Sequence, residues 1–143
     1  MAGRALATRL ITVDTSALLA RLNRRDPDHE RVLRAMANEP GPWIVPAAIL
    51  GELGYLLVSR GTPAALEAFL GDLDDGTYAL DAGAEDIPRV RVLVRRSADL
   101  PLGLVDAMVI ACAERNGGRV ATLDRRHFGI VAREGTIALV PAE

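Results

Sequence analysis

Short apolar runs alternate with longer apolar or amphipathic segments along the chain, and this pattern predicts strands followed by helices. The first run, Ile11-Thr12-Val13, ends at Asp14 and predicts a short buried strand. An apolar segment from Thr15 to about Asn23 follows at once and predicts a helix, with Thr15 or Ser16 as its N-cap. Because ligands bind at the carboxyl ends of strands in an open parallel sheet, Asp14 is a candidate reactive group.

The same pattern continues to the end of the chain. Further strands are expected at residues 43–45, 77–80, 119–122 and 137–140. Helices are expected at residues 28–36, 47–59, 63–70, 84–96 and 104–115, with a short helical turn at 125–128. The acidic segment 71–76 is expected to be a solvated turn, since its spacing does not match a calcium-binding EF-hand loop. The alternation predicts an α/β fold, with helices covering both faces of a mainly parallel sheet in one domain over residues 1–143.

Composition restricts both the core and the chemistry. The core must be aliphatic, because 50% of the residues are hydrophobic and only 3% are aromatic. All 17 basic residues are arginine, so any mechanism that needs a catalytic lysine is excluded. The formal net charge of −2 gives no general attraction to a polyanion. If the substrate is a nucleic acid, a bound metal or local arginine clusters must supply the positive field.

Nothing in the pattern indicates a membrane protein or an exported one. No apolar run approaches the roughly 20 residues that cross a bilayer, and residues 1–10 lack the apolar segment of a secretory signal. The single cysteine, Cys112, lies in an apolar helical segment and is expected to be a small buried residue rather than a nucleophile. We therefore expect a cytoplasmic protein.

Four acidic residues occupy comparable places in the predicted fold. Asp14 and Asp124 lie at or just beyond the ends of strands, and Asp124 is also a plausible N-cap. Glu52 and Asp106 lie early in helices that leave the same edge of the sheet, if the crossovers are right-handed. Glu52 is expected to face apolar neighbours, with an exposed position as the alternative. Each acid has a local explanation, but the four together predict a carboxylate cluster.

Such a cluster requires a cation. Two carboxylates about 4 Å apart repel each other by roughly 4 kcal/mol at an effective dielectric constant of about 20. Oxygen ligands without histidine or cysteine select Mg²⁺, with Mn²⁺ as a second possibility, over zinc. One or two such ions suit phosphodiester hydrolysis, because they acidify water and stabilise the attacking and leaving oxygens.

Four segments, taken in order, resemble the motifs of the PIN-domain ribonucleases. They are residues 13–18 (Val-Asp-Thr-Ser-Ala-Leu), 45–47 (Val-Pro-Ala) with Glu52-Leu53, 102–107 (Leu-Gly-Leu-Val-Asp-Ala) and 121–128 (Ala-Thr-Leu-Asp-Arg-Arg-His-Phe). The chain length and the last segment resemble the VapC-type toxins of toxin–antitoxin pairs. The resemblance covers almost the whole chain, and the ordered set of motifs is highly specific.

The resemblance implies a three-layer α/β/α sandwich and Mg²⁺-dependent endoribonuclease activity. On the matching positions, Asp14, Glu52, Asp106 and Asp124 become the catalytic and metal-binding acids. Asp14 and Asp106 are the firmest metal ligands of the four.

Other residues near these motifs are given supporting roles. Ser16 and Thr122 are expected to hold a ligand, a water or a phosphate. Asp99 lies near a place where the family often has an acid and is expected to act outside the ligand set at most. The resemblance places His127 beside the site rather than in it, and we expect a structural role for it.

The resemblance also implies partners. A VapB-type antitoxin is expected, and the first two helices with the groove they border are candidates to receive its amphipathic segment. An antitoxin arginine is then expected in the acidic pocket, and family habit suggests a homodimer. RNA is the expected substrate, and its class is not written in the motifs.

Rival readings fail on particular residues. A phosphoacceptor receiver domain and a haloacid-dehalogenase-like phosphatase need a lysine that the chain does not have. A P-loop or dinucleotide fold needs a glycine-rich first turn, which Asp14-Thr15-Ser16-Ala17 is not. The remaining alternative is a catalytically weak PIN module that binds RNA or a protein partner.

Overall fold

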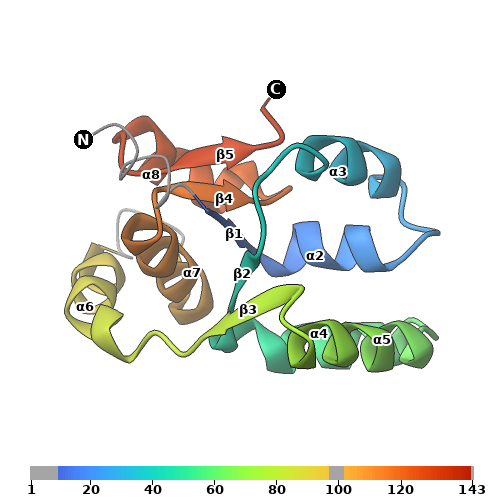
Figure 1. Cartoon of the computed structure of the whole chain (residues 1–143). Helices are drawn as coiled ribbons and strands as arrows, with labels where there is room; N and C mark the ends of the chain where they lie inside the picture. Colours follow the sequence, from blue (N-terminus) through green and yellow to red (C-terminus); the bar gives the residue numbers. More distant parts are fainter. Residues whose placement is uncertain (1–9, 97–101, 143) are drawn as a thin grey trace.

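The five predicted strands form one parallel sheet with the order β3-β2-β1-β4-β5 (Figure 1). Their bounds are Ile11–Val13 (β1), Trp43–Pro46 (β2), Tyr78–Asp81 (β3), Arg119–Ala121 (β4) and Ala138–Val140 (β5). The structure is a computed structural model, which describes residues 10–96 and 102–142. The predicted mainly parallel α/β architecture is confirmed.

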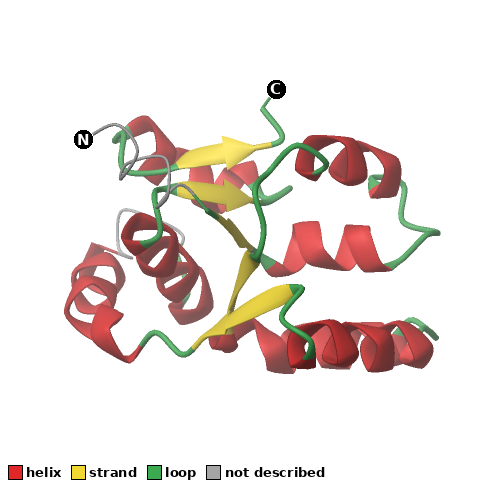
Figure 2. Cartoon of the chain, viewed as in Figure 1, coloured by secondary structure: helices red, strands yellow, loops and turns green. Residues whose placement is uncertain are grey.

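Helices connect the strands and cover the sheet. They are α2 (Thr15–Leu22), α3 (His29–Met36), α4 (Leu50–Ser59), α5 (Pro63–Asp74), α6 (Ile87–Arg95), α7 (Leu104–Arg115) and α8 (Arg125–Arg133), with the 3₁₀ turns η1 (Ala47–Ile49) and η2 (Ala84–Asp86). Helices α6 and α7 lie on one side of the sheet, and α2, α4 and α5 lie on the other (Figures 1 and 2). This is the expected three-layer α/β/α arrangement.

Strand register sets which residues meet at the carboxyl edge of the sheet. Strand β1 is central and pairs with β4 so that Val13 lies opposite Ala121. The next residues along the two chains, Asp14 and Thr122, therefore leave the sheet side by side. The Asp14 amide continues the ladder by donating to the Ala121 carbonyl (2.9 Å). The register thus brings together two segments that are more than 100 residues apart in the sequence.

Helix α7 is the central element of its layer. It contacts strands β1, β2 and β4 as well as helix α6. Its residues from Ala107 to Ala113 are buried except for Met108, which is half-buried, as expected for a helix that is apolar nearly all round. Cys112 is among them, so its predicted role as a small buried residue is confirmed.

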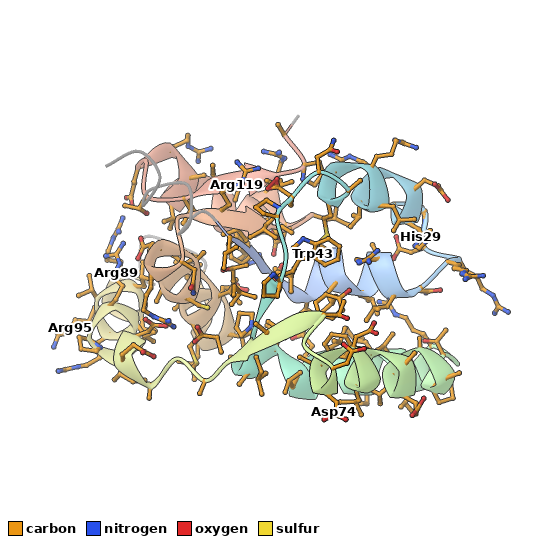
Figure 3. All side chains as sticks on the ribbon, viewed as in Figure 1. His29, Trp43, Asp74, Arg89, Arg95 and Arg119 are labelled. Atoms are coloured by element: carbon orange, nitrogen blue, oxygen red, sulfur yellow. The ribbon has the colours of Figure 1, made fainter. Side chains whose placement is uncertain are left out.

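An ion pair joins helix α6 to α7. Arg89 donates to both carboxylate oxygens of Glu114 (2.8 and 3.0 Å), whereas Arg95 is exposed on the outer side of the helix (Figure 3).

None of the helices in the described residues has the length and the apolar character of a membrane-spanning segment.

Three element boundaries differ from the predictions. Helix α5 runs through Gly71 to Asp74, with Phe69 buried, Asp72 half-buried and Asp74 exposed. Helix α8 extends to Arg133, since both Phe128 and Val131 are buried beneath it. The first turn of the helix predicted at 47–59 is the separate 3₁₀ turn η1.

Candidate functional site

Asp14 lies at the N-cap position of α2, directly after β1, and is only 5% exposed. The predicted capping by Thr15 or Ser16 is wrong: no side chain makes the cap hydrogen bond, and Thr15 is already the first helical residue. The Thr15 hydroxyl is buried without a hydrogen-bond partner among the described residues. The Ser16 hydroxyl turns back and donates to Asp14 Oδ2 instead (3.0 Å).

Two hydroxyls hold the same oxygen of Asp14. Thr122 Oγ1 also donates to Oδ2 (2.8 Å), and the two hydroxyl oxygens lie 3.2 Å apart. Each hydroxyl oxygen in turn accepts a backbone amide of the segment after β4: Leu123 N donates to Ser16 and Asp124 N donates to Thr122, both at 3.0 Å. The carboxylate is therefore fixed in orientation, and neither hydroxyl occupies its second oxygen, Oδ1.

Asp124 begins α8 three residues after β4. Its Oδ1 accepts the backbone amide of His127 (3.0 Å), so the predicted helix cap is confirmed. Its Oδ2 lies 2.6 Å from His127 Nδ1. The side chain is about one-third exposed, which places it at the rim of the site rather than in its floor.

Asp106 belongs to the same electrostatic environment. It lies in the first turn of α7 and is half-buried. Burial raises its pKa above the ordinary value, and the charges of Asp14 and Asp124 raise it further, against a lowering by His127. Burial is likewise the main cause that raises the pKa of Asp14, with a smaller contribution from the charge of Asp124. Three of the four predicted acids therefore interact electrostatically with one another at the carboxyl edge of the sheet.

The chemistry of this donor set fits a hard divalent cation. Carboxylate oxygens are the ligands that Mg²⁺ and Mn²⁺ prefer. Buried acids with raised pKa values lack a compensating positive charge, and a cation would supply one. The three acids do not form a group whose ligand atoms all lie within 4.8 Å of one another. Their separation agrees with the mutual repulsion of like charges.

The fourth predicted acid, Glu52, is not part of this group. Glu52 is exposed in the first turn of α4, so the expectation that it faces apolar neighbours is wrong. The turn η1, which precedes α4, contacts α7, and α7 carries Asp106. Asp99 lies outside the described residues.

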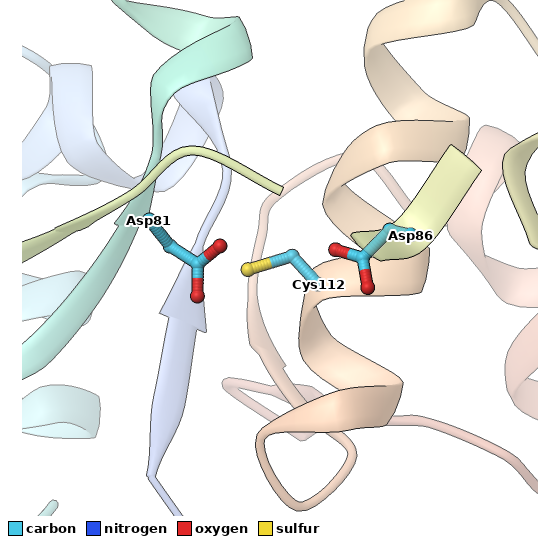
Figure 4. Close-up of side chains that lie close together, drawn as sticks. All are labelled: Asp81, Asp86 and Cys112. Atoms are coloured by element: carbon cyan, nitrogen blue, oxygen red, sulfur yellow. The ribbon is translucent and has the colours of Figure 1, made fainter. Parts of the chain in front are cut away.

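A second acidic group was not found from the sequence. Asp81, Asp86 and Cys112 place one ligand atom each within 4.8 Å of one another, so they form a possible metal-binding group (Figure 4). Arg115, at the end of α7, already donates to both carboxylates, with distances of 2.6 to 2.9 Å. Burial raises the pKa of the Cys112 thiol to about 12, so the thiolate that metals bind is disfavoured. We read this group as a structural ion-pair cluster.

Removing either hydroxyl beside Asp14 tests the geometry. In Ser16→Ala or Thr122→Val, Asp14 loses one of two donors to Oδ2, and we expect Mn²⁺ affinity to fall by roughly 10- to 100-fold. Titration calorimetry measures the affinity. Thr77→Val is the matched control, because Thr77 makes the same hydroxyl-to-carboxylate bond with exposed Asp75 (2.7 Å). Equal affinities in all variants would contradict a role for the hydroxyls.

Comparison with known proteins agrees with this geometry. The sequence pattern of the PIN domain matches residues 11–134. Ribonuclease VapC26 of Mycobacterium tuberculosis is 35% identical over 118 residues, which cover 81% of this chain and 87% of the relative.

Solved structures share the fold at lower identity. The VapC20 toxin of Mycobacterium tuberculosis, described as cleaving the sarcin-ricin loop, superposes with a TM-score of 0.73 at 22% identity, over 84% of this chain and 94% of that one. VapBC2 from Rickettsia felis, bound to a promoter DNA fragment, gives 0.65, and FitAcB from Neisseria gonorrhoeae gives 0.61. Both are 16% identical and cover 91% of this chain and 96% of the other.

Proposed function

The chain belongs to the PIN domain family, and from this premise we propose that it is a Mg²⁺-dependent endoribonuclease that acts as the toxin of a toxin–antitoxin pair. The observation that carries the proposal is the buried Asp14 carboxylate, fixed by two hydroxyls and sharing its electrostatic environment with Asp106 and Asp124. The 35% identity to a ribonuclease toxin supports the same reaction class.

We assign the acids to the metal site and the two hydroxyls to the orientation of Asp14. Asp14, Asp106 and Asp124 would hold Mg²⁺ or Mn²⁺, with Glu52 as a fourth acid whose exposed side chain on α4 is free to reorient. When bound, the ion polarises the scissile phosphodiester and lowers the pKa of water. Ser16 and Thr122 keep Asp14 in one orientation, so the site does not have to be organised at the moment of reaction.

Cellular RNA tests the function. After induction of the wild-type chain, mapping of RNA 5′ ends should reveal new ends at a small set of sites, and Asp106→Asn should remove them. The same map would identify the RNA class. No new ends, with the protein expressed and folded, would favour the alternative of a PIN module that binds RNA or a protein without cleaving.

We also propose an antitoxin as partner, because VapBC2 and FitAcB share the fold and the VapC20 structure is described as that of a toxin. A groove of about 350 Å³ lies between α2, α3 and α5. Its lining combines apolar with polar and charged side chains: Leu22, Leu33, Ala65, Ala68 and Phe69 with Tyr78, Arg21, Arg24, His29 and Asp72. Such a lining suits an amphipathic helix. An arginine from the same segment would take the place of the cation among the acids.

A charge placed in this groove should weaken the complex. Ala68 is exposed in the groove, and Ala68→Arg should lower antitoxin affinity by at least tenfold, or about 1.4 kcal/mol, because the long side chain would fill space that the bound helix needs. Co-purification from the native operon, followed by interferometry, measures the effect. Ala84→Arg is the control, because Ala84 lies on η2, which contacts α7 and does not line the groove. Equal loss in both variants, or none in either, would contradict the docking site.

We further propose a homodimer. Ile87 on α6 and Leu104 on α7 are 48% and 60% exposed and line a shared surface hollow of about 380 Å³ with Val94. Exposed apolar surface of this kind is typical of association sites. Light scattering of the purified chain would give twice the 15.3 kDa monomer mass if this is correct.

A further inference from the structure

His127 contacts both oxygens of Asp124. Its backbone amide donates to Oδ1 (3.0 Å), and its Nδ1 lies 2.6 Å from Oδ2. The first contact is the cap of α8 and needs only the backbone. The second contact needs the imidazole. Both oxygens of one carboxylate are then held by one residue. The two contacts together fix the plane of Asp124, which the cap alone would leave free to rotate.

Asp124 is linked to Asp14 through the Thr122 hydroxyl, which accepts the Asp124 amide (3.0 Å) and donates to Asp14 Oδ2 (2.8 Å). The His127 ring is about one-third exposed, and its Nε2 makes no hydrogen bond to any described residue. The two ring nitrogens therefore have different surroundings: Nδ1 contacts Asp124, and Nε2 faces away from it.

The contact of Nδ1 with Asp124 refines the sequence-based expectation for His127. The motif put His127 beside the site with a structural role. A structural histidine would serve the fold, and the fold is already served by the backbone cap. The Nδ1 contact instead acts on the orientation of a carboxylate at the carboxyl edge. Partners that orient a ligating carboxylate typically contribute 10- to 100-fold to metal affinity or activity.

We propose that His127 is a positioning residue, whose Nδ1–H holds Asp124 Oδ2 so that the carboxylate stays turned toward Asp14 and Asp106 to receive a divalent cation. The proposal rests on the metal site of the proposed function. It assigns no catalytic step to His127, and it makes the engaged nitrogen Nδ1 rather than Nε2.

Amide variants distinguish the two nitrogens. In His127→Asn the amide nitrogen stands near the position of Nδ1, whereas in His127→Gln it reaches toward that of Nε2. We expect Mn²⁺ affinity of the RNA-free protein to fall by about 10- to 100-fold in His127→Ala and His127→Gln, and His127→Asn to restore most of it. All three should unfold at the wild-type midpoint, because the backbone cap remains. Wild-type affinity in His127→Ala, or rescue by Gln and not Asn, would overturn the proposal.

Nitrogen NMR of the wild-type ring gives a reading that depends on neither metal nor RNA. At a pH where the imidazole is neutral, the proposal expects the proton on Nδ1, and a proton on Nε2 would overturn it. Mn²⁺ binding without RNA cleavage would refute the proposed function and leave the His127 result intact. If the wild-type chain bound no Mn²⁺, the proposed metal site would fail, and the tautomer would still decide whether Nδ1 holds Asp124.

Discussion

The Asp14→Asn variant is expected to lose RNA cleavage by at least about 100-fold, while it folds as well as the wild type or better. Asparagine has the same shape, and its side-chain oxygen can still accept from Ser16 and Thr122. It removes the charge that a cation would bind. Loss of one such ligand removes several kcal/mol of transition-state stabilisation, and each 1.4 kcal/mol is about tenfold in rate.

The expected stability of the Asp14→Asn variant follows from the pKa of Asp14. Burial raises that pKa above 3.8, so the folded chain binds the proton more tightly than the unfolded chain does. The stability that this group contributes is complete below pH 3.8 and is lost as the pH rises through the raised value. Asparagine does not ionise, so the variant avoids this loss at neutral pH.

Urea unfolding between pH 3 and pH 8 in the presence of a chelator measures the difference. The free energy of unfolding of wild type relative to Asp14→Asn should fall as the pH rises above about 4. Asp75→Asn is the control, because Asp75 is exposed and its pKa is lowered by Thr77. A cleaving Asp14→Asn variant would remove this residue from the site, and a variant that unfolds more readily at pH 8 would contradict the account of its burial.

Arg115→Ala is expected to lose roughly 3 kcal/mol of unfolding free energy. Arg115 donates to both oxygens of Asp86, which is 7% exposed, and to both oxygens of Asp81. Removal of one partner of a buried pair leaves an uncompensated buried charge, which costs about 3–5 kcal/mol. The lower end of that range applies, because the Arg115 side chain is 31% exposed.

The pH dependence of this effect has the opposite sign to that of Asp14. Arg115 holds the pKa of Asp81 below 3.8, so the stability it contributes is present above that pH and is lost as the pH falls. Arg31→Ala is the matched control, since Arg31 and Asp28 form an exposed pair at 3.8 Å, worth at most about 0.5 kcal/mol. Adding Asp86→Asn to Arg115→Ala should recover part of the loss. Equal destabilisation by Arg31→Ala and Arg115→Ala would contradict the argument.

The sequence was sufficient to predict the carboxyl-edge acids because their positions follow from local patterns. An apolar run that stops at Asp14, and another that stops shortly before Asp124, identify strand ends without knowledge of the sheet order. Asp106 was found because an acid stood at the start of a helix that is apolar nearly all round. The parallel fold then requires these ends to share one edge.

Contacts that depend on exact orientation were not predictable. Glu52 lies early in its helix, as predicted, but its side chain is exposed. The cluster of Arg115 with Asp81 and Asp86 joins residues 34 and 29 positions apart, and no local pattern links them. The nearest signal was Asp81 at a strand end, which resembles Asp14 in the sequence but is neutralised by an arginine in the structure.

The carboxyl-edge acids are proposed to form a cation site at which RNA is cleaved. The most direct measurement is cleavage of a labelled RNA by the purified chain, first with excess chelator and then with Mg²⁺ or Mn²⁺ restored. We expect no cleavage in chelator, full recovery with either ion, and no recovery in Asp14→Asn. Cleavage that proceeds undiminished in chelator would contradict this proposal.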